Sequence, residues 1–194
     1  MTRIVSGFAG SLTLQVPKSG TRPTSDRVRE AIFSALDARD AIHGARVLDL
    51  YAGSGALGLE AVSRGAVSAV LVEKNAAAVQ VCRRNAAALA AAARSALRHP
   101  DVPLPGVEVR ASAVSSYVAG ASGPFDLVFI DPPYDVGDSD VLGVLTALVP
   151  MLSEEAVICL ERSARGAEPS LPDGLSLERR KDYGDTAIYW LTPA

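Results

Sequence analysis

The sequence predicts an α/β protein built on a mostly parallel seven-stranded sheet, with a small N-terminal β-hairpin extension. Three observations indicate this fold. From Arg46 onward, short apolar strand patterns alternate with helical patterns, which is typical of βαβ units. A glycine-rich stretch follows the first of these strands, where α/β proteins bind ligands. Two successive strand patterns end the chain, which predicts an antiparallel C-terminal strand.

The N-terminal part of the chain is predicted to form a hairpin and then a helix. Residues 3–16, RIVSGFAGSLTLQV, are short apolar and β-branched stretches broken by glycines, which favours a small hairpin. A capped helix with an apolar stripe is expected at residues 26–39. We therefore expect two parts, a hairpin extension at residues 1–24 and a main domain at residues 25–194.

The main domain is predicted to alternate strands and helices along its length. Strands of a parallel sheet that is covered on both faces are nearly continuous apolar runs. Five such runs lie at residues 46–50, 68–73, 107–110, 125–130 and 156–161. Helical patterns fall between them, at residues 57–64, 75–97, 113–119 and 139–150. The last two strands are expected at residues 175–180 and 186–191, on either side of a turn.

The composition excludes several classes of protein. No apolar run has the length that a membrane span needs, and the N-terminus has no hydrophobic signal core. We therefore expect a cytoplasmic protein with no membrane partner. Cys82 and Cys159 lie in apolar patterns and are expected to be buried core residues. His43 and His99 are isolated, so no metal site is expected.

The charge of the chain is unevenly distributed. The formal net charge is −3, which by itself argues against a nucleic-acid partner. Residues 1–29, however, hold five basic side chains against one acid, so a basic segment precedes an acidic body. Such a segment can form a local phosphate-binding face; the alternative is ordinary surface charge. The candidate RNA contacts are Arg3, Lys18, Arg22, Arg27 and Arg29.

A glycine loop follows the first strand of the main domain. Gly53, Gly55 and Gly58 have the spacing G-x-G-x-x-G, and Glu73 ends the next strand, 20 residues after Gly53. Glycines allow a sharp turn and a close approach of the ligand, while a carboxylate at the end of the second strand accepts hydrogen bonds from ribose hydroxyls. The pattern therefore predicts an adenosine-containing cofactor.

The acid before this loop selects among such cofactors. Asp49 lies four residues before Gly53. A dinucleotide places its pyrophosphate at the helix N-terminus, where a nearby acid is unfavourable. S-adenosylmethionine has a sulfonium, an ammonium and no phosphate, so Asp49 suits it better. NAD, and with it an oxidoreductase, is the alternative.

The run D-x-Y-A-G-S-G-x-x-G resembles the first motif of class I S-adenosylmethionine-dependent methyltransferases. The resemblance implies the Rossmann-like fold of that class, with Asp49 and the loop, including Tyr51, Gly53 and Gly55, around the methionine moiety and Glu73 on the ribose. Ser112 and Ala113 fall where these enzymes contact the adenine, although many of them have Asp or Asn in place of Ser112.

The fourth strand ends in Asp131-Pro-Pro-Tyr134. An exocyclic amine or an amide is a poor nucleophile, because its lone pair is delocalised. Two acceptors aimed at its N–H groups would orient that lone pair and favour the positive charge that develops on nitrogen. The Asp131 carboxylate and the Pro132 carbonyl supply two such acceptors, and Asp131 is also expected among the residues that contact the cofactor. Tyr134 offers a face on which a flipped base can stack.

This tetrapeptide resembles the [D/N/S]-P-P-[Y/F/W] signature of amino methyltransferases, which modify adenine, cytosine or guanine amines or the amide of glutamine. Glutamine enzymes typically begin the signature with Asn, so Asp131 favours a nucleobase. Methylation of adenine N6 in DNA or of a glutamine amide is kept as an alternative.

The N-terminal region and the C-terminal Tyr183-Gly-Asp-Thr186 resemble the RsmD family, so that the similarity covers nearly the whole chain. The family pattern is R-I-x-x-G, a hairpin, and then R-P-T-x-D-x-V-R-E-x-x-F. The resemblance implies methylation of guanine N2 in 16S ribosomal RNA, with the rRNA or the small subunit as partner and the basic N-terminal residues on its phosphates. A monomer is expected. A non-enzymatic RNA-binding assembly factor is a further alternative. The N-terminal matches are Arg3, Ile4, Gly7, Arg22, Pro23, Thr24, Asp26, Val28, Arg29, Glu30 and Phe33.

Overall fold

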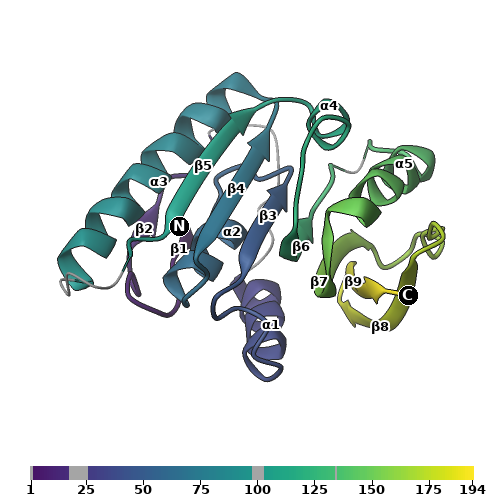
Figure 1. Cartoon of the computed structure of the whole chain (residues 1–194), viewed down its shortest axis with the longest axis horizontal. Coiled ribbons are helices and arrows are strands. Elements are labelled where there is room, and N and C mark those ends of the chain that lie inside the picture. Colours follow the sequence, from purple (N-terminus) through teal and green to yellow (C-terminus); the bar gives the residue numbers. More distant parts are fainter. Residues whose placement is uncertain (1, 18–25, 98–102, 134) are drawn as a thin grey trace.

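A seven-stranded sheet in the order β5-β4-β3-β6-β7-β9-β8 forms the centre of the protein (Figure 1). The structure is a computed structural model that describes residues 2–17, 26–97, 103–133 and 135–194. Strands β3 to β7 pair in parallel, and β9 runs antiparallel to both β7 and β8. The strands are β3 (Arg46–Leu50), β4 (Ser68–Glu73), β5 (Gly106–Ala111), β6 (Phe125–Ile130), β7 (Leu152–Ser163), β8 (Leu175–Tyr183) and β9 (Thr186–Pro193). The predicted sheet, including its antiparallel end, is confirmed.

The central strands are buried on both faces of the sheet. Leu127 and Phe129 of β6 belong to one hydrophobic core, and the alternate residues Val128 and Ile130 belong to a second core. This alternation follows from the strand geometry, in which successive side chains point to opposite faces. It explains why β3 and β6 are apolar runs rather than alternating patterns.

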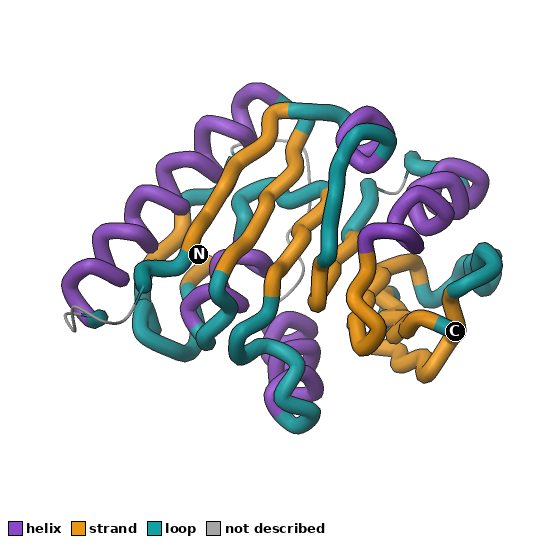
Figure 2. The backbone as a smooth tube through the Cα atoms, in the orientation of Figure 1, coloured by secondary structure: helices purple, strands orange, loops and turns teal. Residues whose placement is uncertain are grey.

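Helices cover both faces of this sheet (Figure 2). Helices α1 (Asp26–Asp37), α2 (Ala56–Ser63) and α3 (Ala76–Ala96) contribute to the first core. Helices α4 (Val114–Val118) and α5 (Asp138–Leu148) contribute to the second, and a short 3₁₀ helix, Val149–Met151, follows α5. This is the class I methyltransferase fold. The chain leaves β3 toward β4 and β5 on one side and returns to β6 on the other, which creates a ligand-binding crevice at the carboxyl ends of β3 and β6.

The N-terminal hairpin packs directly on α2. Its strands β1 (Thr2–Arg3) and β2 (Thr13–Leu14) pair antiparallel, so the predicted hairpin is confirmed with shorter strands. Gly7 has φ +84°, and a Cβ atom at this position would lie 1.7 Å from the Ser63 carbonyl oxygen. Only glycine allows so close an approach. The division of the chain at residues 24 and 25 stays a prediction.

Several element boundaries differ from the prediction by one to four residues, among them the end of α1 and the start of β7. Helix α1 ends at Asp37, where turn hydrogen bonds from Arg39 and Asp40 replace the helical pattern and Asp40 takes φ +51°. Strand β7 begins at Leu152, directly after the 3₁₀ helix, and is therefore longer than its apolar run. Among the described residues, no helix has both the length and the apolar character that crossing a bilayer requires.

Candidate functional site

A cavity of about 820 Å³ lies at the carboxyl ends of β3, β4 and β6. It brings together residues from distant parts of the chain, from the end of the hairpin to the segment after β7. Seven of the predicted site residues line this cavity: Asp49, Tyr51, Gly53, Glu73, Asp131, Pro132 and Arg29. Tyr134, Lys18 and Arg22 lie outside the described residues, so their roles stay predictions.

The glycine loop holds an uncommon backbone conformation. Tyr51, Gly53 and Gly55 have φ angles of +62°, +56° and +79°. For Tyr51 this left-handed conformation costs roughly 1–2 kcal/mol. The spacing from Gly55 to Gly58 has a packing cause as well, since a Cβ atom on Gly58 would lie 2.3 Å from Leu71 Cδ2. The loop therefore keeps α2 close to the sheet and turns backbone groups toward the cavity.

Glu73 connects this loop with the start of α3. One carboxylate oxygen accepts a hydrogen bond from the Gly53 N–H at 2.9 Å, and the other accepts one from the Asn75 N–H at 2.7 Å. A carboxylate has about four lone-pair sites, so these two bonds leave capacity for a ribose hydroxyl. The two bonds also fix the orientation of the carboxylate before any ligand arrives.

Asp49 is a buried acid beneath the loop. Its side chain is 2% exposed, and Oδ2 accepts a hydrogen bond from the Gly58 N–H at 2.9 Å. Burial raises the pKa of Asp49 to about 7, the Gly58 bond opposes this rise, and the charges of Asp131 and Glu73 add to it. A cation in the cavity would favour the ionised form. The charge of Asp49 therefore fits a cationic ligand, as the sequence predicts.

The segment after β6 places the predicted amine-binding residues at the cavity. Asp131 is partly buried, close enough to Asp49 to raise its pKa, and Pro132 lines the cavity. The Pro133 carbonyl accepts a hydrogen bond from the Val136 N–H at 2.9 Å, which closes a turn. This turn directs the chain away from the sheet immediately after the motif.

Arg162 at the end of β7 holds the far side of this turn. Its guanidinium donates to the Val136 carbonyl at 3.2 Å and to Asp138 at 2.7 Å. The sequence alone did not predict a role for Arg162. Its signal in the sequence was its position directly after the apolar run of residues 156–161. The parallel pairing of β7 with β6 brings the carboxyl end of β7 to the same edge of the sheet.

Asn85 is a second residue whose role the sequence alone did not predict. It is 2% exposed, donates to the carbonyls of Gln15 and Ser54 at 2.9 Å each, and accepts from the Gln15 N–H. It therefore joins the end of the hairpin to the glycine loop. A polar residue within the apolar stripe of α3, between Cys82 and Leu89, was its signal.

The predicted adenine contacts follow β5 at the same edge of the sheet. The Ser112 N–H donates to the Glu73 carbonyl, and the Ser112 hydroxyl donates to the Ala113 carbonyl. Ser112 borders a second cavity, on the side of β4 and β5. The contacts of Ser112 and Ala113 with adenine stay predictions, and so does a role for Gly55 in cofactor binding.

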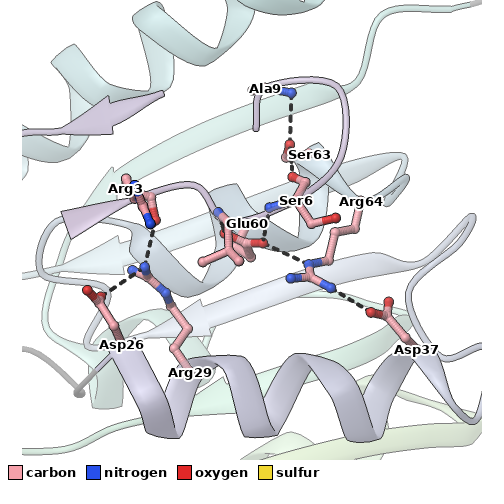
Figure 3. Close-up of polar contacts among 10 residues, drawn as sticks. Arg3, Ser6, Ala9, Asp26, Arg29, Asp37, Glu60, Ser63 and Arg64 are labelled. Atoms are coloured by element: carbon pink, nitrogen blue, oxygen red, sulfur yellow. Dashed lines mark hydrogen bonds and ion pairs between the residues drawn. The ribbon is translucent and has the colours of Figure 1, made fainter. Parts of the chain in front are cut away.

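The predicted RNA-binding residues divide into two groups. Arg3 and Arg27 are exposed. Arg29 is only 2% exposed and donates to the Arg3 carbonyl and to the carboxylate of the exposed Asp26 (Figure 3). RNA contacts of Arg3 and Arg27 are thus compatible with their position and stay predictions, whereas Arg29 faces the interior.

Comparisons with known proteins agree with this geometry. The family described as conserved hypothetical protein 95 matches residues 2–192. The ribosomal RNA small subunit methyltransferase D of Escherichia coli (strain K12) is 37% identical over 186 residues, covering 95% of this chain and 86% of that protein. Among solved structures, yhhF of Escherichia coli has a TM-score of 0.81 at 34% identity and covers 99% of this chain and 97% of its own. A hypothetical protein of Thermus thermophilus has a TM-score of 0.80 at 30% identity, with both chains fully covered.

Proposed function

The chain belongs to the family described as conserved hypothetical protein 95, and we propose that it transfers a methyl group from S-adenosylmethionine to the exocyclic N2 of a guanine in 16S ribosomal RNA. The observation that carries this proposal is the acid-lined cavity in which Asp49 and the Asp131-Pro132 pair come from neighbouring strand ends. The relative named ribosomal RNA small subunit methyltransferase D supports the choice of RNA substrate.

The charge of the cavity supports S-adenosylmethionine over NAD. Among its described lining residues, six carboxylates face three cationic side chains. A pyrophosphate would be repelled by this surplus of acid, whereas a sulfonium and an ammonium are attracted to it. The carboxylates are Asp49, Glu73, Asp131, Asp135, Asp138 and Glu161, and the cations are Arg29, Lys74 and Arg162.

The residues of the chain have separate tasks in the proposed reaction. When bound, S-adenosylmethionine would supply an electrophilic methyl group and would leave as S-adenosylhomocysteine once its sulfur–methyl bond breaks, while the methylated nitrogen loses one proton. Asp49 and the glycine loop hold the methionine end, and Glu73 holds the ribose. Asp131 and the Pro132 carbonyl accept hydrogen bonds from the guanine amino group, which directs its lone pair toward the methyl and stabilises the charge that forms on nitrogen. Tyr134 stacks on the flipped base.

The basic N-terminal residues serve the RNA in this proposal. Arg3 and Arg27, together with Lys18 and Arg22, contact phosphates, while the acidic body holds the cofactor. A folded ribosomal RNA presents its base by shape, so a chain of this size needs no separate recognition domain. A cytoplasmic monomer is consistent with this role and stays a prediction.

The proposal is tested by methyl transfer from labelled S-adenosylmethionine to purified small ribosomal subunits and to free 16S RNA, followed by mapping of the methylated base. We expect N2-methylguanine at one position. N6-methyladenine in DNA or methylglutamine in protein as the sole product would contradict the substrate. Calorimetry that shows tighter binding of NAD than of S-adenosylmethionine would contradict the cofactor, and cofactor binding without turnover on any substrate would favour an assembly factor.

A further inference from the structure

Arg29 is a buried cation with an unused hydrogen-bond donor. Its Nη2 donates to the Arg3 carbonyl at 2.6 Å and to Asp26 Oδ1 at 3.1 Å. Its Nε is buried and has no hydrogen-bond partner. Leaving a buried donor unsatisfied is destabilising, and more so when the group is charged. Such a donor in a ligand cavity indicates a partner that arrives with the ligand.

The rest of the side chain is held in place by its neighbours. Figure 3 shows Arg29 rising from α1 toward the backbone of Arg3 in the hairpin and toward Asp26. The contact with the Arg3 carbonyl joins α1 to the hairpin, so the guanidinium is oriented before a ligand binds. It lines the same cavity as Asp49 and the glycine loop. Preorganised donors of this kind bind an anion with little loss of conformational entropy.

The proposed cofactor carries one anionic group, the carboxylate of its methionine end. In a cavity with twice as many acids as cations, this carboxylate is repelled unless a cation is next to it. Arg162 already donates to the Val136 carbonyl and to Asp138. Lys74 is exposed and follows Glu73, at the end of the cavity where the ribose is expected. Arg29 is therefore the cation best placed for the carboxylate.

We propose that the Arg29 guanidinium binds the carboxylate of the methionine moiety of S-adenosylmethionine. The inference rests on the proposed function and replaces the RNA contact predicted for this residue. An RNA phosphate carries a similar anionic oxygen, but a polynucleotide backbone cannot reach a side chain that is 2% exposed without opening the hairpin. A small ligand inside the cavity can reach it.

Calorimetry with two ligands tests the assignment. S-adenosylhomocysteine keeps the carboxylate, and its decarboxylated analogue differs only by the loss of that group. A hydrogen bond between charged groups contributes about 1.5–3 kcal/mol, so we expect the wild type to bind S-adenosylhomocysteine roughly 10- to 100-fold more tightly. Arg29→Gln should reduce this ratio to about threefold or less and leave RNA affinity unchanged. Arg27→Gln, an exposed position on the same helix, is the matched control and should keep the ratio.

Each other outcome has a definite meaning. Equal affinity of the wild type for both ligands would overturn the assignment whether or not Arg29→Gln folds. A variant that loses affinity for both ligands by the same factor would show a structural role alone and would also overturn it. A loss of RNA affinity with the ligand ratio kept would return Arg29 to the RNA. Failure of the wild type to bind either ligand would refute the proposed cofactor itself, together with this inference.

Discussion

The acids at the two ends of the β3–β6 strand pair have opposite electrostatic environments. At the amino ends, Asp126 accepts hydrogen bonds from Arg46 N, Nε and Nη2 at 2.9, 2.7 and 2.8 Å. These bonds lower the pKa of Asp126 to about 2. At the carboxyl ends, Asp49 and Asp131 repel each other, and burial raises the pKa of Asp49 to about 7. The same two strands thus end in a satisfied ion pair on one side and in mutually repelling acids on the other.

This difference separates the end of the strand pair that stabilises the fold from the end that lines the proposed cofactor cavity. The Arg46–Asp126 pair joins β3 to β6 and balances its own charge. Asp49 at the other end, and the buried Nε of Arg29, lack that balance in the free protein. Groups kept in such unfavourable states are typical of functional sites, where the ligand completes them.

The largest effect is expected from Asp131→Ala at the carboxyl end. We expect methyl transfer to small subunits to fall at least about 100-fold, because the variant loses the acceptor that orients the amino group and stabilises its developing charge. Binding of S-adenosylhomocysteine should change by less than about threefold, since the main task of Asp131 is on the amino group of the substrate. Incorporation of labelled methyl groups and calorimetry measure the two quantities.

Glu155→Ala is the matched control for Asp131→Ala. It removes an exposed carboxylate from β7, away from the cavity. Activity of this control should stay within about twofold of wild type. Wild-type turnover by Asp131→Ala would show that this acid has no part in methyl transfer.

A smaller effect on binding, with a gain in stability, is expected for Asp49→Asn. The amide keeps an oxygen for the Gly58 N–H but carries no charge, so cofactor affinity should fall about 10- to 100-fold. The free protein should become more stable at pH 8, by on the order of 2 kcal/mol, because a buried charge is removed. Calorimetry and thermal unfolding test the two signs. A variant less stable than wild type at pH 8 would show that the buried acid supports the fold.

The pH dependence of the wild type tests the cost of the buried Asp49 charge in a second way. The pKa of folded Asp49, about 7, lies above the ordinary value of 3.8 for an aspartate. Between these two pH values the folded protein keeps the Asp49 proton, whereas the unfolded chain has released it. The stability that protonated Asp49 contributes to the fold is therefore lost as pH rises through about 7. Cofactor affinity should change in the opposite direction, falling up to about tenfold for each pH unit below 7. Asp49→Asn is the reference, and equal pH profiles for both proteins would contradict the assignment.

Much of the fold could be predicted from the sequence because its signals are local. The apolar run of β6 and the glycines after β3 determine a strand and a turn through their own backbone and burial preferences. The site acids were predictable for the same reason, since Asp49 and Glu73 lie at fixed positions relative to the loop. Asp131 was predictable because it comes directly after the apolar run that forms β6.

Contacts between distant segments were not predictable in this way. Asn85 has a polar side chain on an apolar helix face, which signals a buried partner but does not identify Gln15 and Ser54. Arg29 resembled its exposed neighbour Arg27 in sequence, and only the packing of the hairpin on α1 separates the two. The charge of the N-terminal segment predicts RNA contacts for both arginines alike.

The smallest effect is expected at the amino ends, from Asp126→Asn. The variant loses the charge that pairs with Arg46 but keeps one acceptor oxygen, and the pair is partly exposed, so we expect a loss on the order of 1 kcal/mol at pH 7. Because the pKa of folded Asp126 lies below the ordinary value of 3.8 for an aspartate, this stabilisation is present above about pH 4 and is lost as pH falls toward 2. Thermal unfolding at pH 7 and pH 3 should therefore show the gap between variant and wild type narrowing in acid. Cofactor affinity should not change, and a change would mean that the two ends of the strand pair are coupled rather than independent.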